Sequence, residues 1–234
     1  TMVISEIGRR LMLKVRDAVT EWLANLKVTP NALTLTGMVI NFLAGWSFAL
    51  GKNIQAALLI IFAGAFDILD GAVAKQRNMV TKFGAFFDST IDRYSDLFLF
   101  GGIIIYFIRI NKPLFVAFGI SSLIASQLVS YTRARAESLT SECKVGFWER
   151  PERTVYLLIG AFANNLATVI MIEAFLIHTT AIQRILYARA KLSDNKKKPA
   201  LIYRLIFWDF QRYTLTYDIM VAILASLPFF IRPL

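Results

Sequence analysis

The stretch DILDGAVAK (residues 67–75), followed after eight residues by GAFFDSTID (residues 84–92), decides how this chain folds. Asp67 and Asp70 are three apart, and Asp88 and Asp92 are four apart, so each pair shares a face if its segment is helical. The short connection predicts two antiparallel helices that bring all four carboxylates to one depth. Carboxylates that repel one another need cations, and hard oxygen ligands favour Mg²⁺, Mn²⁺ or Ca²⁺.

Two glycines accompany the acids. Gly71 and Gly84 lack side chains where a phosphorylated ligand could approach the backbone. Asp96 continues the face of Asp92, and we expect it to form a structural pair with Arg93. The alternative is that all the acids are ordinary helix-end charges, solvated or paired with basic neighbours. The matched spacing of four acids and two glycines favours a metal site over that alternative.

The rest of the chain indicates an all-α integral membrane protein. It has 234 residues, 56% of them hydrophobic, and its apolar runs approach the roughly 20 residues that a transmembrane helix needs. Four spans are expected at about 32–50, 54–74, 83–108 and 114–133. The apolar stretch 155–188 is too long for one crossing, and Asn164-Asn165 predicts a hairpin of two helices there. The expected fold therefore has six transmembrane helices.

The two ends of the chain differ from this central domain, expected at 28–190. Residues 1–27 mix basic and apolar residues and predict an amphipathic helix at the membrane interface. Residues 191–234 form a basic linker and an apolar segment of unassigned role. We expect that segment to pack at the interface or to re-enter the membrane, with a seventh span as the alternative.

Charge and cysteine content narrow the possible functions. The formal net charge of +10 beside apolar spans is typical of contact with membrane lipids or phosphorylated substrates, and we expect no nucleic-acid partner. One of the two predicted membrane faces carries only Lys52, Arg109 and Lys112. The basic excess on the acidic side predicts a multi-pass cell-membrane protein whose aspartates face the cytoplasm. Cys143 is the only cysteine, which excludes an intramolecular disulfide and a thiolate metal cluster.

The two acidic motifs resemble the signature of the CDP-alcohol phosphotransferases, D-x-x-D-G-x-x-A-R, a spacer, then G-x-x-x-D-x-x-x-D. The resemblance covers roughly residues 28–190 and implies a six-helix membrane enzyme, usually a homodimer, with a cavity open to the cytoplasm. It implies two Mg²⁺ ions, with Mn²⁺ as an alternative: Asp67, Asp70 and Asp88 around the first, and Asp67, Asp88 and Asp92 around the second. Asp92 would also be the general base.

The same resemblance implies a binding site for the CDP-lipid, either CDP-diacylglycerol or CDP-archaeol. Lys75 departs from the family pattern, because an arginine usually stands there and a lysine cannot make a bidentate phosphate contact. The residues implied in CDP-lipid binding are Pro30, Asn31, Thr34, Gly71, Lys75, Thr81 and Gly84.

Three downstream stretches bear on the acceptor alcohol. SYTRARAE (130–137), VGFWERPER (145–153) and Gln183-Arg184 resemble the phosphatidylinositol phosphate synthase branch and its archaeal-lipid counterparts. The resemblance implies inositol phosphate as acceptor, with Arg133, Arg153 and Arg184 binding its phosphate. Within the family, the alternative is a phosphatidylglycerophosphate synthase. From a different class, a cation transporter could also place carboxylates between helices.

Overall fold

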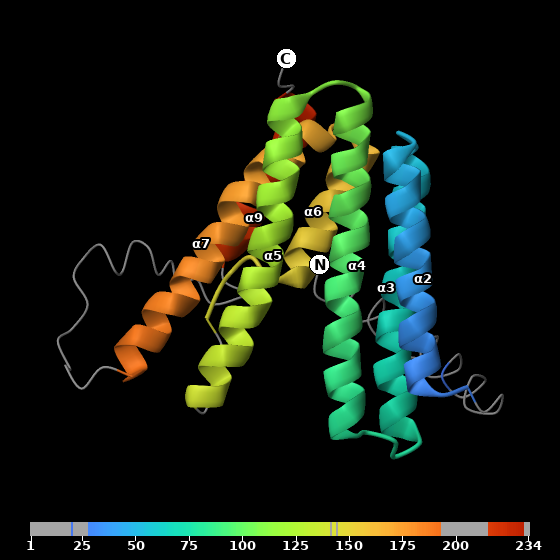
Figure 1. Ribbon diagram of the computed structural model, residues 1–234, viewed down its shortest axis with the longest axis vertical. Coiled ribbons are helices and arrows are strands. Elements are labelled where there is room, and N and C mark those ends of the chain that lie inside the picture. The colour runs from blue at the N-terminus through green and yellow to red at the C-terminus, as the bar shows by residue number, and fades with distance from the viewer. Residues whose placement is uncertain (1–19, 21–27, 141, 144, 193–214, 232–234) are drawn as a thin grey trace.

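The computed structural model describes residues 20, 28–140, 142–143, 145–192 and 215–231 (Figure 1). The interfacial helix expected at 1–27 lies outside them, apart from Thr20. All regular elements in the described part of the chain are helical, which agrees with the all-α expectation. They are α2 (Pro30–Ala49), α3 (Asn53–Gln76), α4 (Lys82–Arg109), α5 (Pro113–Leu139), α6 (Arg150–Phe162), α7 (Leu166–Leu192) and α9 (Leu215–Phe230).

Residues in the left-handed conformation separate consecutive helices. Gly51, Asn78, Asn111 and Asn164 all have φ between 51° and 75°, the conformation that commonly follows a helix and that glycine and asparagine adopt at low cost. The breaks implied by the expected spans, between 50 and 54 and between 108 and 114, and the turn expected at Asn164-Asn165 are confirmed. Since each connection is short, the helices from α2 to α5 alternate in direction.

Close backbone contacts hold α2 against α4. A Cβ at Gly45 would overlap the carbonyl oxygen of Phe98, and a Cβ at Gly102 would overlap the carbonyl oxygen of Gly45. The two helices therefore approach closely because both positions lack side chains. Figure 1 shows α2, α3 and α4 along the long axis, with α5 and α7 inclined to them. In addition, α2 packs against α3, and α5 packs against α7.

The outer surface is apolar, as expected of a membrane protein. Trp46, Phe62, Ile108 and Phe175 are each at least 60% exposed. Four helices, α2, α3, α5 and α7, are long and apolar enough to cross a bilayer. The expected count of six spans is not confirmed, because α6 has only 13 residues and the 28-residue α4 carries charged side chains along its first half.

The apolar C-terminal segment forms α9, which contacts α6 and α7. The Asn165 side chain donates hydrogen bonds to the carbonyl oxygens of Pro228 and Ile231 at 2.8 and 2.6 Å. Thr168 Oγ1 donates to the same Ile231 oxygen at 2.7 Å. These bonds cap the carboxyl end of α9 at the α6–α7 turn.

Candidate active site

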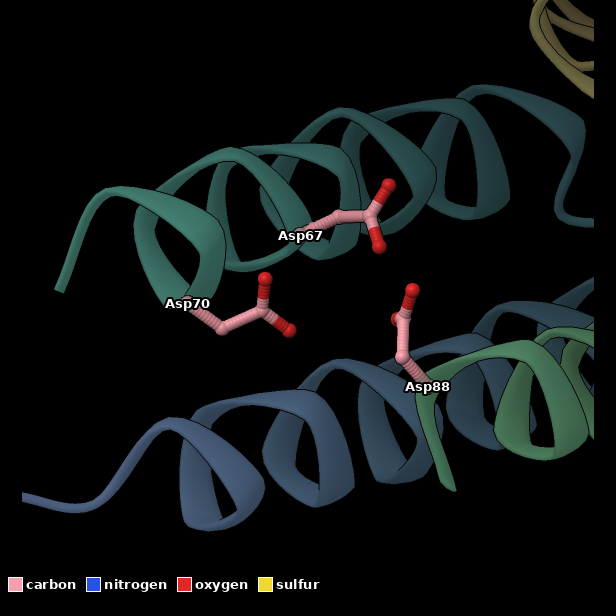
Figure 2. Close-up of side chains that lie close together, drawn as sticks. All are labelled: Asp67, Asp70 and Asp88. Carbon is pink, nitrogen blue, oxygen red and sulfur yellow. The ribbon is translucent and has the colours of Figure 1, made fainter. Parts of the chain in front are cut away.

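Three of the predicted aspartates converge between α3 and α4 (Figure 2). Asp67 and Asp70 project from α3 toward Asp88 of α4, and one carboxylate oxygen from each lies within 4.8 Å of the other two. The close approach arises because α3 and α4 run antiparallel on either side of the turn at Asn78 and both pack against α2. Asp70 is buried, whereas Asp67 and Asp88 are partly open to solvent.

The chemistry of these three side chains fits a hard divalent cation. Carboxylates at this separation repel each other strongly unless a positive charge lies among them. Asp88 Oδ1 is buried without a hydrogen-bond partner, so it is free to be a ligand. Asp70 is held in place by Thr34 of α2, whose Oγ1 donates a hydrogen bond to Asp70 Oδ2 at 2.5 Å.

Asp92 lies beside a different group, the guanidinium of Arg150 at the start of α6. Arg150 Nη1 is 2.6 Å from Asp92 Oδ1 and 3.5 Å from Asp67 Oδ2. Burial opposes the charge of Arg150, but the surrounding carboxylates, Asp92 foremost, raise its pKa above the ordinary value. The guanidinium is therefore a permanent cation between Asp67 and Asp92.

Asp96 does not have the partner expected from the sequence. It accepts a hydrogen bond from Arg153 Nη2 at 2.6 Å, and Arg150 Nε lies 3.9 Å from its other oxygen. The expected pair with Arg93 is therefore wrong. Asp96 faces α6, which presents Arg150 and Arg153 on one side because they are three residues apart, while the Arg93 guanidinium donates to the Ser89 carbonyl.

The residues expected to bind the CDP-lipid lie around the same end of the bundle. Thr81 caps α4 by accepting a hydrogen bond from the Gly84 amide at 2.9 Å. A Cβ at Gly84 would lie 3.1 Å from Thr81 Oγ1 and 3.8 Å from Asn31 Oδ1, so these three residues adjoin one another. Space is open at Gly71, and Lys75 is exposed in the last turn of α3. Pro30 is the first residue of α2.

Two cavities lie beside the aspartates and share a wall at Asp92 and Arg150. The first has a volume of about 400 Å³ and runs between α2, α3, α4 and α6, with Asp67 and Asp92 among apolar residues such as Met38, Ile68 and Val155. The second has a volume of about 690 Å³ and is lined chiefly by charged side chains of α4 to α7. Residues that line both cavities are Asp92, Asp96, Arg150 and Pro151.

The second cavity brings together the three arginines expected to bind the acceptor phosphate. Arg184 is 2% exposed and is fixed by hydrogen bonds to the carbonyls of Val145 and Val129 and to Glu149. Arg153 is 3% exposed in its pair with Asp96. Arg133 is 46% exposed and lies 3.5 Å from Glu149. All three guanidinium groups therefore already have an acidic neighbour.

Sequence reasoning missed several residues of this region. Arg150, Asp96 and Glu149 all line the second cavity, although none was assigned to a site. The available signal was the run ERPER at 149–153, which places two arginines on one helical face beside two acids. Glu173 of α7 was also missed: it is fully buried and neither carboxylate oxygen has a hydrogen-bond partner.

The sequence matches the CDP-alcohol phosphatidyltransferase family over residues 27–186. The archaetidylinositol phosphate synthase of Methanothermobacter thermautotrophicus is 41% identical over 166 residues, which cover 68% of this chain and 83% of that protein. A crystal structure of phosphatidylinositol phosphate synthase from Mycobacterium tuberculosis with CDP-DAG bound is 29% identical, with a TM-score of 0.71 over 80% of this chain and 100% of that one. The same enzyme in complex with manganese and citrate gives a TM-score of 0.70 at 29% identity, over 79% of this chain and 92% of that one.

Proposed function

The chain belongs to the CDP-alcohol phosphatidyltransferase family, and from this premise we propose that it transfers the phosphatidyl or archaetidyl group of a CDP-lipid to inositol phosphate. The products are phosphatidylinositol phosphate, or its archaeal counterpart, and CMP. One observation carries the proposal: Asp92 and Arg150 line both the cavity with apolar walls and the cavity with clustered arginines. A lipid donor and a phosphorylated acceptor in these cavities would meet at Asp92.

The aspartates would bind the diphosphate of the CDP-lipid through divalent cations. Asp67, Asp70 and Asp88 would hold a first divalent cation, and Asp67, Asp88 and Asp92 would hold a second, with Mg²⁺ as the expected ion and Mn²⁺ as the alternative. Bound cations would neutralise the diphosphate and polarise its oxygens. A manganese complex is known for the related Mycobacterium tuberculosis enzyme.

The CDP moiety would lie over the open backbone at Gly71, where a side chain would obstruct it, and next to Gly84, which adjoins Thr81 and Asn31. Asn31, Thr34 and Thr81 would supply polar contacts from the start of α2 and α4, with Pro30 fixing the direction of the chain there and Lys75 adding positive charge. The lipid tail would extend along the apolar walls of the first cavity toward Met38 and Val155.

Arg133, Arg153 and Arg184 would bind the acceptor phosphate in the second cavity, since clustered guanidinium groups are suited to a phosphate dianion. The acceptor hydroxyl oxygen would attack the phosphorus that carries the lipid. The bond from that phosphorus to the bridging oxygen breaks, and its electrons leave with CMP. Asp92 would take the proton of the hydroxyl group.

The placement in the cell follows from the charge distribution. We propose a multi-pass cell-membrane protein whose site faces the cytoplasm, because the basic residues gather at the acidic end of the bundle. Residues 28–190 would form the transferase domain and 1–27 an interfacial helix, with 191–234 as an extension. A homodimer is proposed from the family resemblance alone.

Purified enzyme tests the proposal directly. We expect CMP release from CDP-diacylglycerol or CDP-archaeol only when Mg²⁺ or Mn²⁺ and an acceptor are present, with inositol phosphate used far better than inositol or glycerol 3-phosphate. Mass spectrometry of the lipid product identifies the acceptor. The Asp92→Asn variant should lose roughly 10²–10⁴-fold in rate, the usual contribution of a general base. Consumption of glycerol 3-phosphate with no use of inositol phosphate would contradict the acceptor while leaving the enzyme class intact.

The transporter alternative makes a different prediction. A carboxylate pathway for ions is expected near the middle of the membrane, whereas Asp67 and Asp70 lie in the second half of α3 and Asp88 lies in the first third of α4, toward the same end of the bundle. Ion flux through reconstituted vesicles without CMP release would favour transport over transfer.

A further inference from the structure

The wall shared by the two cavities contains one ion pair that joins the donor side to the acceptor side. Arg150 Nη1 lies 2.6 Å from Asp92 Oδ1, and both residues line both cavities. The oxygen expected to take the acceptor proton is thus already bonded to a cation that itself faces the acceptor cavity. The roles proposed for Arg133, Arg153 and Arg184 in phosphate binding do not include this ion pair.

Arg150 also differs from its neighbours in how firmly it is held. Arg184 and Arg153 are at most 3% exposed and are fixed by hydrogen bonds or ion pairs of 2.6 Å. The Arg150 side chain is 28% exposed, and beyond Asp92 its contacts to Asp67 and Asp96 are long, at 3.5 and 3.9 Å. One short contact therefore determines where its guanidinium lies, and a competing anion could displace that contact.

We propose that Arg150 is a positioning residue that holds Asp92 in an ion pair until a phosphorylated acceptor enters the second cavity. This inference rests on the transfer reaction proposed above. The acceptor phosphate, a dianion, replaces the Asp92 carboxylate as the partner of the Arg150 guanidinium. Asp92 Oδ1 is then free to accept a hydrogen bond from the acceptor hydroxyl, so the base becomes available only when the correct nucleophile is bound. The ion pair involves Oδ1 alone, so the other oxygen of Asp92 stays available to the second cation proposed above.

Protection of the donor from water is the functional consequence. With Asp92 free and no acceptor present, a water oxygen could attack the lipid-bearing phosphorus. The bond to the bridging oxygen would break with its electrons leaving on CMP, Asp92 would take a proton, and the lipid phosphate would be released. The Arg150 ion pair removes the base from that reaction, so hydrolysis stays slow while the donor waits for its acceptor.

The test compares transfer with hydrolysis in the purified, Mg²⁺-loaded enzyme. CMP release from CDP-diacylglycerol is measured with inositol phosphate and without any acceptor. For Arg150→Gln we expect release without acceptor to rise at least about tenfold over wild type while transfer falls, since a freed base contributes up to 10²–10⁴-fold. Arg150→Lys keeps a cation near Asp92 and should stay close to wild type in hydrolysis.

Arg153→Gln is the matched control, because Arg153 lines the acceptor cavity but pairs with Asp96 instead of Asp92. It should lose transfer without gaining hydrolysis. In the double variant Asp92→Asn with Arg150→Gln, the gain should disappear. An equal rise in hydrolysis for Arg153→Gln would overturn the proposal, because cavity damage alone would then explain the result.

A measurement on the wild-type enzyme does not depend on how the variants fold. Methyl phosphate offers the phosphate group without an alcohol, so it should draw Arg150 from Asp92 and increase CMP release to water. No increase at concentrations that inhibit transfer competitively against inositol phosphate would overturn the proposal. If wild type transfers nothing to inositol phosphate, the proposed function fails; if it transfers normally and only these hydrolysis effects are missing, the role of Arg150 alone fails.

Discussion

Single side chains from three helices define the acidic site, and Thr34 is the one that connects α2 to it. Its hydroxyl donates to Asp70 at 2.5 Å and thereby orients a buried carboxylate. Hydrogen bonds to charged groups contribute about 1.5–3 kcal/mol. An acid held in this way needs no rearrangement before it binds a cation.

Removing this hydroxyl should weaken metal binding. We expect Thr34→Val to lower the affinity for Mn²⁺ by about tenfold or more, from the loss of a charge-assisted hydrogen bond. Thr34→Ser keeps the donor and should bind Mn²⁺ nearly as wild type does. Mn²⁺ titration followed by electron paramagnetic resonance measures both affinities, and equal losses in the two variants would contradict the role of the hydrogen bond.

Substitutions at two acids of α4 should affect metal binding and acceptor binding separately. Asp88 adjoins Asp67 and Asp70, whereas Asp96 is bonded to Arg153. We expect Asp88→Asn to abolish Mn²⁺ binding in the same titration. Asp96→Asn should retain Mn²⁺ binding but raise the KM for inositol phosphate, because Arg153 loses its fixed partner. A loss of Mn²⁺ binding in both variants would show that Asp96 belongs to the metal site.

The sequence alone was sufficient to predict the convergence of Asp67, Asp70 and Asp88. Their helical spacing and the short connection between α3 and α4 are local properties, so they can be predicted from one short stretch of sequence. The ion pairs of Arg150 and Arg153 could not be predicted in this way. Asp96 and Arg153 are 57 residues apart, and their contact depends on where α6 lies, which is set by its packing against α3 and α7 and which no local pattern specifies.

At the scale of elements, the packing of α2 on α4 depends on two glycines. Gly45 and Gly102 face each other so closely that a side chain on either would meet backbone atoms of the other helix. Backbone cannot move aside as a flexible side chain can. The contact therefore sets both the distance and the register between these helices.

Adjacent glycines of α4 offer a matched test of this contact. Gly102→Ala should lower stability by at least about 2 kcal/mol, in the range typical of overpacking. At Gly101, a Cβ would meet nothing within 4 Å, so Gly101→Ala should leave the protein as stable as wild type or slightly more so. Thermal unfolding in detergent measures both, and similar melting temperatures for the two variants would contradict the packing role.

Helices and turns were more predictable than the number of membrane crossings. The breaks at Gly51, Asn111 and Asn164 follow from residue preferences for positive φ, and the structure has them where they were expected. The number of membrane-spanning helices could not be predicted from residue preferences in this way. Hydropathy along α4 mixes an acidic first half with an apolar second half. The turn at Asn164, which was expected, leaves α6 with only 13 residues, short of a full crossing.

At the scale of the whole molecule, basic side chains are distributed unequally between the two ends of the bundle. Lys52, Arg109 and Lys112 lie at the end opposite the aspartates, while Lys75, Lys82 and the cavity arginines lie at the acidic end. Basic residues favour the cytoplasmic side of a membrane. The excess of basic residues at the end with the aspartates therefore predicts that the acceptor comes from the cytoplasm.

Cysteine labelling can measure this orientation. Cys143 is buried, so Cys143→Ser gives a background for Val80→Cys at the acidic end and Lys112→Cys at the other. A membrane-impermeant maleimide added to intact cells should label the Lys112→Cys variant and should label the Val80→Cys variant only after permeabilisation. The reverse pattern would place the aspartates outside the cytoplasm.

The contact between Gly45 and Gly102 has a consequence for how the enzyme can change shape. Thr34 and Asp88, on the two helices that it joins, cannot slide past each other without a collision of main-chain atoms. We therefore expect the α2–α4 pair to keep a constant spacing and register. If the cavity must widen to admit a polar substrate, we expect α5, α6 and α7, which carry the cavity arginines, to move.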